Sequence, residues 1–366
     1  MRSLWPFLFG VIVGVGASLL SSKRGLSSSG RRSALIDEDP HLSSGPYIVA
    51  IGGGTGLSSF LVGLKSFTKN ITAIVTVTDE GGSSGRLTRD WGLLPPGDIR
   101  NCIVALSEND DDFKKIMDFR FDKGDLSGHS LGNLVLLAAT EVYGDFMIAV
   151  ERVNRLLSMR GRVLPISSET MVLFAEASDG EMLRGELAIS SRGKDLRNIW
   201  LEPKGIKPVN EAIHSLLNAD VIVLGPGSLF TSVIPNLLVD DFREKLYNTT
   251  IPVIYIANLM TQPGETEGMS TLDHLDWLDK IVGRLPDFVV VNDQRIPDEL
   301  LDRYTADGAV PLGLDEEEET SLSKRGCGVI RGNFLRISSV NGSTVVRHDG
   351  RRVSEAILSF LGSDLR

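Results

Sequence analysis

Four glycine-rich loops constrain the fold of this chain more than any other feature of its sequence. Each follows an apolar run typical of a buried parallel strand, and the loops lie at residues 52–56, 81–85, 225–228 and 262–266. The parallel strands of an open α/β sheet end on one rim, and ligands bind in the crevice there. Glycines let the backbone approach a ligand, and amides at helix starts point toward an anion. Together the loops predict a site for a large phosphorylated ligand.

The charge and the cysteine content narrow the classes of function. The net charge of −10 over 366 residues argues against a nucleic-acid-binding surface, which needs basic patches. A local phosphate pocket built from backbone amides remains compatible with that charge. The two cysteines, Cys102 and Cys327, lie far apart in the sequence. This spacing indicates a reducing compartment and argues against a zinc site.

The order of apolar runs predicts an α/β fold. Residues 47–78 read as strand, glycine turn, helix and strand, a βαβ unit with a parallel crossover. Short alternating runs at about 162–205, with a hairpin signal at 178–180, predict a small antiparallel β insertion. Parallel strands resume near 221–225, 252–257 and 288–291. We therefore expect an open, mostly parallel sheet with helices on both faces.

Other segments are assigned from local signals. We expect a helix at 98–108 with Asp98 as its N-cap and a second helix at 131–143. The acidic residues 315–319 are most simply a solvated loop. A hairpin turned at Asn341-Gly342 and a helix at about 353–361 end the chain.

The N-terminus differs from the rest of the chain. Residues 4–20 carry no charge and approach the length of a membrane-spanning helix. Most nearby basic residues follow this run, which favours an anchor with the body in the cytoplasm. A cleaved signal peptide or an unstructured extension are the alternatives. The predicted division is an anchor at 1–22, a flexible tether at 23–45, the α/β domain at 46–350 and a C-terminal helix at 351–366.

The first glycine loop has no dinucleotide or P-loop spacing. No register gives G-x-G-x-x-G, and Gly-Lys-Ser/Thr is absent from the sequence of the loop. A turn without a ligand needs only one or two glycines. We predict contact with a phosphate or a ribose through Gly53, Gly54, Thr55 and Gly56.

Asp79 ends the second predicted strand. An acid at this position commonly binds a ribose hydroxyl, but Asp79 with Glu80 could instead hold a divalent metal beside a phosphate. A solvated acid at a strand end is the simpler alternative. The next loop contains Gly82 and formally matches G-x-S-x-G with Ser83 at its centre, although the surrounding sequence does not support an esterase.

Polar residues at two helix starts are candidates for the same crevice. Arg100 and Asn101 lie in the first turn of the first predicted helix. Ser130 is a natural N-cap for the second, while His129 and Asn133 can donate hydrogen bonds to a ligand. Asn258 flanks the fourth loop. Near the C-terminus, residues 347–349 form either a donor-rich cluster or a salt-bridged surface corner.

Several long motifs carry a resemblance to a known family. They are IGGGTGLSSFLVGLK, AIVTVTDEGGSSGRL, LLPPGDIRNCIVAL, GHSLGNLVL, DVIVLGPGSLFTSVIPNLLV and YIANLMTQPGET. In this order the chain resembles the CofD-like family, in its YvcK-type gluconeogenesis factor branch, from about residue 47 to about 350. The resemblance implies a Rossmann-like fold, a cytoplasmic location and a role in cell shape and cell-wall supply during gluconeogenic growth. It also implies binding of a UDP-sugar such as UDP-N-acetylglucosamine.

The resemblance also implies site residues. The family's pocket corresponds here to Gly53, Gly54, Thr55, Asp79, His129, Asn133, Gly225, Gly227, Ser228, Tyr304 and Arg347. One departure bears on a metal. The branch usually has two aspartates before the double glycine, and this chain has Asp79-Glu80. Glutamate keeps the charge but moves it by a methylene, so Asp79 is the metal-ligand candidate.

Two hypotheses of different classes follow. In the first, the protein is a non-catalytic sensor that binds a nucleotide sugar and acts through a regulatory or cell-wall-synthesis partner, with homo-oligomers as an option. In the second, it resembles the related 2-phospho-L-lactate transferases and moves a phosphorylated group by positioning and charge neutralisation. The sequence favours the sensor, because no nucleophile with an adjacent base stands out.

Overall fold

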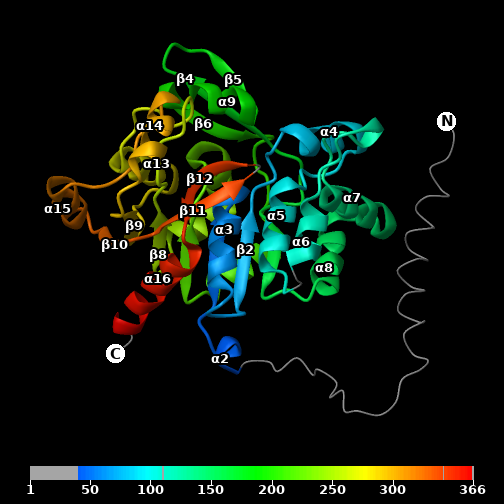
Figure 1. Ribbon diagram of the computed structural model, residues 1–366, viewed down its shortest axis with the longest axis horizontal. Helices are drawn as coiled ribbons and strands as arrows, with labels where there is room; N and C mark the ends of the chain where they lie inside the picture. The colour runs from blue at the N-terminus through cyan, green and yellow to red at the C-terminus, as the bar shows by residue number, and fades with distance from the viewer. Residues whose placement is uncertain (1–39, 109–110, 341, 365–366) are drawn as a thin grey trace. The chain divides into compact units, whose positions relative to one another are not determined.

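The computed structural model describes residues 40–108, 111–340 and 342–364. Its centre is a parallel sheet of seven strands in the order β10-β9-β8-β7-β1-β2-β3 (Figure 1). The strands are β1 (Ile48–Gly52), β2 (Ile71–Val75), β3 (Arg162–Pro165), β7 (Val221–Leu224), β8 (Val253–Ile256), β9 (Phe288–Asn292) and β10 (Gly328–Gly332). The order reverses direction at β1, which β2 and β7 flank. This is the switch point at which open α/β sheets form their ligand crevice.

Burial explains why this sheet is parallel. Every residue of β1, β2, β7 and β8 is buried, so these strands have no solvent-facing side. Continuous apolar runs of this kind require helices on both faces of the sheet. The predicted α/β class, with an open, mostly parallel sheet, is confirmed.

The helices cover the sheet in two groups. On one side, α3 packs against both α5 and α16, while α10, α11, α12 and α13 form a second connected group. The helices are α2 (Pro40–Ser43), α3 (Gly54–Leu64), α4 (Gly82–Trp91), α5 (Gly97–Leu106), α6 (Asp111–Asp118), α7 (Leu131–Tyr143), α8 (Phe146–Leu156), α9 (Glu186–Arg192), α10 (Asn210–Leu217), α11 (Ile234–Leu237), α12 (Asp240–Tyr247), α13 (Thr271–Val282), α14 (Asp298–Ala306), α15 (Glu316–Lys324) and α16 (Gly350–Asp364), with a π-helix, η3 (Leu229–Val233).

The antiparallel insertion is smaller than the sequence predicts. A three-stranded sheet contains β4 (Val172–Ala177), β5 (Met182–Arg184) and β6 (Leu196–Glu202) in the order β5-β4-β6. The run at 162–165, predicted to belong to the insertion, is β3 of the parallel sheet and pairs with β2. The run after Gly185 was predicted to continue as a strand and instead forms α9. Gly185 has φ of +84°, which ends the strand and lets the chain turn into the helix.

Two further sequence assignments are wrong. The acidic run at 315–319 begins α15, where Asp315 and Glu318 form a reciprocal capping box. Acidic side chains stabilise a helix start through the free amides and the helix dipole, so the run is a helix signal and not only a solvated loop. Asp98 is not the N-cap of α5. Pro96 takes that place, and Asp98 lies in the first turn.

The end of the chain has the expected elements. β11 (Leu335–Val340) and β12 (Ser343–His348) pair antiparallel across the predicted turn, and α16 follows. Asn341 and the predicted anchor and most of the predicted tether, within residues 1–39, lie outside the described residues. In the part that the structure describes, no single helix has the length and apolar character to cross a bilayer. Only α7 and α8 taken together reach those criteria, and they are bent by 118°.

Candidate functional site

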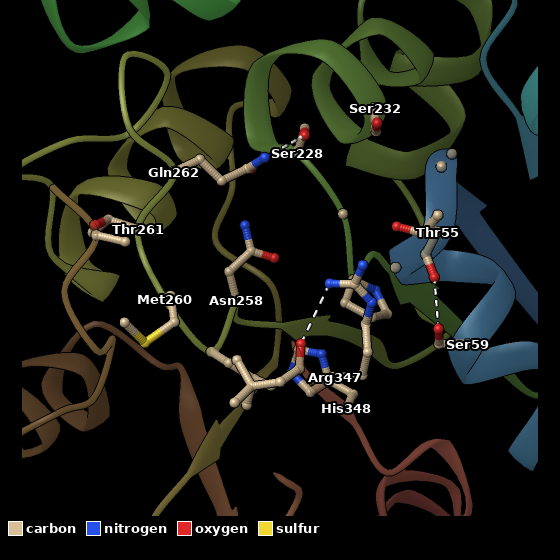
Figure 2. A pocket seen from close by; sticks show the side chains of 18 of the residues that line it. Thr55, Ser59, Ser228, Ser232, Asn258, Met260, Thr261, Gln262, Arg347 and His348 are labelled. Atoms are coloured by element: carbon tan, nitrogen blue, oxygen red, sulfur yellow. Dashed lines mark hydrogen bonds between the residues drawn. The ribbon is translucent and has the colours of Figure 1, made fainter. Parts of the chain in front are cut away.

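A cavity of about 520 Å³ opens at the carboxyl ends of β1, β7 and β8 (Figure 2). Its walls come from the first, third and fourth glycine loops and from β12, which lie far apart in the sequence. Figure 2 shows the Arg347 side chain in the middle of the cavity, between Asn258 and Thr55. The lining residues are Gly53, Gly54, Thr55, Gly56, Ser59, Asp79, Asp98, Glu186, Pro226, Gly227, Ser228, Ser232, Asn258, Leu259, Met260, Thr261, Gln262, Pro263, Tyr304, Asp307, Ala309, Val346, Arg347 and His348.

The structure brings many of the predicted site residues together in this cavity. Those that line it are Gly53, Gly54, Thr55, Gly56, Asp79, Gly227, Ser228, Asn258, Tyr304 and Arg347. Those outside its lining are Gly82, Ser83, Arg100, Asn101, His129, Asn133 and Gly225. The second glycine loop therefore contributes only through Asp79, the residue that precedes it by two positions.

The first and third loops pack backbone against backbone. A Cβ atom on Gly56 would lie 2.6 Å from the carbonyl oxygen of Pro226, so no larger residue fits there without displacing one loop. Gly54 has φ of +66°, and a Cβ there would meet only Ser232 at 3.7 Å. The two glycines have different roles: Gly56 allows the loops to touch, and Gly54 starts α3 in a left-handed conformation beside open space.

Side-chain hydrogen bonds connect the fourth glycine loop to the third loop and to the start of η3. Gln262 donates from Nε2 to Ser228 Oγ at 2.8 Å. Glu265, which is 3% exposed, accepts the N–H of Phe230 at 3.0 Å. Burial raises the pKa of Glu265, against the hydrogen bonds that favour its charged form. The start of η3 therefore already holds a carboxylate of the protein, and sequence reasoning did not identify Glu265 in this role.

One end of the cavity is acidic. Asp79, Asp98 and Glu186 converge there, and Asp98 accepts the N–H of Gly54. Burial, together with the charge of Asp79, raises the pKa of Asp98 to about 7. Burial, with Asp79 and then Asp98, raises the pKa of Glu186 to about 8. Sequence reasoning missed Glu186 because it assigned α9 to a strand.

β12 and α14 bring three further polar side chains to the cavity, Arg347, His348 and Tyr304. Arg347 donates only to the carbonyl oxygen of its neighbour Val346, at 3.3 Å, and forms no salt bridge among the described residues. Tyr304 accepts the N–H of Val346 at 3.1 Å, which fixes its phenol against β12. His348 lies 3.1 Å from the carbonyl oxygen of Ala257, and burial lowers its pKa to about 4, so its imidazole is neutral. Arg347 is thus the cation that the cavity presents to a ligand.

Three predicted residues form a separate buried cluster between α4 and α7. Ser83 Oγ lies 2.9 Å from His129 Nδ1 and accepts a hydrogen bond from Asn133 Nδ2 at 3.1 Å. These side chains do not line the cavity.

The remaining predicted residues have structural partners. Arg100 does not line the cavity and forms an ion pair with Asp118. Asn101 hydrogen-bonds Asp98 and so acts on the cavity through that carboxylate. Glu80, beside Asp79, extends toward Gly185, where an added Cβ would clash with its carboxylate. Gly225 turns the chain after β7 with φ of +76°.

The described residues contain no group of three or more His, Cys, Asp or Glu side chains arranged to hold a metal ion. A divalent cation in the cavity would therefore need some of its ligands from a bound substrate, in addition to the protein. Mg²⁺ is commonly held by one or two carboxylates together with phosphates of a bound substrate. The acidic end of the cavity fits that arrangement, with Asp79 as the first candidate.

The fold and the cavity define a Rossmann-like α/β protein with a ligand-sized crevice at the switch point of its sheet. Comparison with known proteins gives the family. The family model described as 2-phospho-L-lactate transferase CofD matches residues 48–335, and the chain belongs to this family.

Its relatives carry a common name. The gluconeogenesis factor of Halalkalibacterium halodurans is 43% identical over 85% of this chain and 95% of its own length, and that of Bacillus subtilis is 42% identical over 86% and 98%. A putative gluconeogenesis factor of Clostridium acetobutylicum is 38% identical over 97% of this chain and 82% of its own length. A crystal structure of a UPF0052 family protein from Bacillus halodurans superposes with a TM-score of 0.80 at 42% identity, covering 86% of this chain and 99% of the other.

Proposed function

We propose that this protein is a gluconeogenesis factor that binds a UDP-sugar in the cavity and regulates cell shape and cell-wall precursor supply during gluconeogenic growth. The observation that carries the proposal is the unpaired Arg347 in the middle of a crevice with glycine loops on one side and acids at one end. The names of the relatives support the gluconeogenesis-factor part of the proposal.

The dimensions and chemistry of the cavity fit a nucleotide sugar. Its volume of about 520 Å³ lies within the range of about 300–1,000 Å³ typical of ligand sites. Such a ligand has a diphosphate between two hydroxyl-rich ends. Arg347 is placed to bind the diphosphate as a charged fork, and Asp79 or Asp98 can accept hydrogen bonds from hydroxyl groups.

The charge balance favours a divalent cation with the ligand. Four acidic side chains line the cavity, from Asp79, Asp98, Glu186 and Asp307, against the single guanidinium of Arg347. Burial and mutual repulsion raise the pKa of Asp98 to about 7 and that of Glu186 to about 8, so these two acids carry only part of their charge near neutral pH. A diphosphate adds further negative charge beside these acids. A cation bridging the diphosphate and Asp79, with Asp98 or Glu186 as a second ligand, would offset that repulsion and supply electrostatic stabilisation.

The protein acts as a sensor in this proposal and not as a transferase. Among the described residues that line the cavity, none is a Ser or Thr hydroxyl hydrogen-bonded to a histidine, and the Ser83–His129 pair lies elsewhere. The alternative, a 2-phospho-L-lactate-transferase-type reaction, is favoured by the family match. That chemistry needs no protein nucleophile, because positioning and charge neutralisation suffice.

Location and partners complete the proposal. A UDP-sugar ligand places the cavity in the cytoplasm, and residues 4–20 tether the protein to the inner face of the membrane. The partner is a regulatory or cell-wall-synthesis protein, and nucleic acid is not a ligand because the chain is acidic.

A turnover assay separates the two candidate functions. The full chain is incubated with a panel of UDP-sugars and phosphorylated donors, with and without Mg²⁺, and products are followed by chromatography. The sensor predicts that UDP, UMP and transferred sugar stay at the level of a control without protein. Product above that level that disappears in Asp79→Asn would establish the transferase instead.

A further inference from the structure

A second pocket lies between the antiparallel insertion and the body of the domain. Its volume is about 320 Å³, at the lower end of the range of about 300–1,000 Å³ typical of ligand sites. One wall comes from residues 198–201 of β6 and from the segment 203–206 that follows it. The other comes from the start of α12 and the end of α13. The pocket shares no lining residue with the cavity, so it is a separate site whatever ligand the cavity binds.

The deep part of this pocket is apolar. Ile199, Leu201 and Ile206 line it and are 3%, 6% and 4% exposed. Leu238 and Ile281 complete this surface, and both pack against the core of the domain. A hydrocarbon group placed there would displace water from apolar side chains, which favours binding. The deep part therefore fits the apolar portion of a ligand.

The more exposed part of the pocket is positively charged. Lys204, Arg243 and Lys280 line it, against the single acid Asp240. Arg243 donates to Asp240 at 2.6 Å, which uses one of the five N–H donors of its guanidinium. Lys204 forms no hydrogen bond or ion pair among the described residues. Because the whole chain has a net charge of −10, this local excess of positive charge is specific to the pocket.

The environment of Lys280 favours an anion beside it. Its Nζ donates to the carbonyl oxygen of Arg197 at 2.6 Å and lies 4.1 Å from the centroid of the Trp277 ring. Burial lowers the pKa of Lys280, and Arg197 acts in the same direction. In the part of the chain that the structure describes, no carboxylate pairs with this ammonium. An anionic ligand would supply the missing negative charge.

The strand that borders the pocket narrows the kind of ligand. Among the described residues, β6 pairs with β4 and with no other strand, so one of its edges is open. Two of its backbone groups bond side chains instead of a strand. The N–H of Ile199 donates to Asn198 Oδ1 at 3.0 Å, and the carbonyl oxygen of Arg197 accepts from Lys280. A strand added by a protein partner needs such groups for its own hydrogen bonds, and a small ligand does not.

We propose that this pocket binds a small amphipathic acid, with its hydrocarbon group in the deep apolar part and its anionic head group among Lys204, Arg243 and Lys280. The head group is a carboxylate or a phosphate, since a guanidinium and two ammonium groups bind either. The ligand contacts the insertion through β6 and the body through α12 and α13, so it stabilises the folded arrangement of the two.

The test uses the full chain with octanoate as the probe, below the concentration at which it forms micelles. The indole N–H of Trp200, which lines the pocket, is observed by NMR after ¹⁵N-tryptophan labelling and assigned with Trp200→Phe. We expect octanoate to shift this resonance in a saturable manner and to leave that of Trp91, an exposed residue of α4, in place. Octan-1-ol lacks the charge and acetate lacks the hydrocarbon group, so each should bind more weakly. Octyl phosphate, compared with octanoate, identifies the preferred head group.

Variants separate this pocket from general binding of amphipathic molecules. Lys204→Gln removes an exposed cation and should weaken octanoate binding roughly two- to fivefold, the effect of one exposed charge pair. Lys204→Glu reverses the charge and should weaken binding further. The matched control is Lys207→Gln, because Lys207 is an exposed lysine that pairs with Asp241 and does not line the pocket. It should bind octanoate normally, and UDP-sugar affinity should stay unchanged in all three variants.

Three results would overturn the proposal. The first is a Trp200 resonance that octanoate leaves unmoved. The second is octan-1-ol binding as tightly as octanoate, which would show that the positive charge plays no part. The third is octanoate affinity in both Lys204 variants equal to that in Lys207→Gln.

Discussion

Glu265 Oε1 accepts the N–H of Phe230 at 3.0 Å, so a buried carboxylate of the fourth glycine loop occupies the start of η3. This bond holds the third and fourth loops in one arrangement. Because Glu265 already accepts this amide, the start of η3, which follows the third glycine loop, is not free to bind an anion of the ligand. The ligand is left with the amides of the first loop and with Arg347.

The first prediction concerns Glu265. Glu265→Ala leaves a buried N–H without an acceptor and should lower the free energy of unfolding by about 1–3 kcal/mol. Glu265→Gln keeps an acceptor and should cost less.

The pH dependence follows from the same side chain. Because burial raises the pKa of Glu265, its contribution to the stability of the fold is present at low pH and is lost as pH rises through the raised pKa. Urea unfolding from pH 4 to 8 measures both effects. Glu267→Ala, which removes a partly exposed acid paired with Lys194, is the control, and an equal loss in both alanine variants would refute the role of Glu265.

The second prediction concerns the acidic end of the cavity. The pKa of Asp98 is raised from 3.8 to about 7, so its stabilising contribution is complete below pH 3.8 and disappears as pH rises through about 7. Asp98→Asn should therefore flatten the fall of melting temperature between pH 5 and pH 8, and Asp302→Asn, an exposed control, should not. Mg²⁺ should restore more stability at pH 8 than at pH 5. A pH profile unchanged by Asp98→Asn would show that this carboxyl titrates normally.

The third prediction uses two glycines with the same backbone conformation. Gly54 and Gly92 have φ of +66° and +68°. A Cβ atom added to Gly54 would lie 3.7 Å from Ser232 Oγ, and one added to Gly92 would have no atom within 4 Å. An alanine at either position should cost about 1 kcal/mol of folding free energy because of backbone strain. Only Gly54→Ala should weaken UDP-sugar binding, because Gly54 lines the cavity and Gly92 does not. Equal binding by the two variants in calorimetry would place the ligand away from the first loop.

The fourth prediction concerns the N-terminus. If residues 4–20 insert into the membrane, the full chain should pellet with membranes and resist carbonate extraction. Deletion of residues 1–24 should release the protein, and a reporter fused after Arg366 should be exposed to the cytoplasm. An extracytoplasmic signal from that fusion would reverse the topology and would separate the cavity from the cytoplasmic pool of UDP-sugars.

The sequence predicts the parallel core well because its signal is local. The runs at β1, β2, β7 and β8 are mostly apolar and buried at every position, and a glycine ends β1 and directly follows β7. The predictions fail where one pattern fits two structures. The short run at 162–165 reads equally as an insertion strand or as an edge of the main sheet, and only its pairing with β2 decides.

The site residues also divide into those that the sequence can predict and those that it cannot. Residues that follow a strand, such as Gly54 and Asp79, can be placed on the shared rim from the sequence. Glu186 and Glu265 cannot, because they enter through packing of the insertion and of the fourth loop onto the rim. His129 was predicted to donate a hydrogen bond to a ligand in the crevice, but it does not line the cavity, and its ring nitrogen lies beside the hydroxyl of Ser83, 46 residues away in the sequence.

The central claim is that the cavity binds a UDP-sugar through Arg347, and calorimetric titration of the full chain tests it most directly. With Mg²⁺ present, the account predicts micromolar affinity for at least one UDP-sugar. Arg347→Gln should weaken binding at least tenfold, since a hydrogen bond to a charged group is worth about 1.5–3 kcal/mol. Arg336→Gln, on the paired strand β11 and outside the cavity lining, should bind normally. Absence of binding by the unmodified chain, or equal affinity in the two arginine variants, would contradict the account.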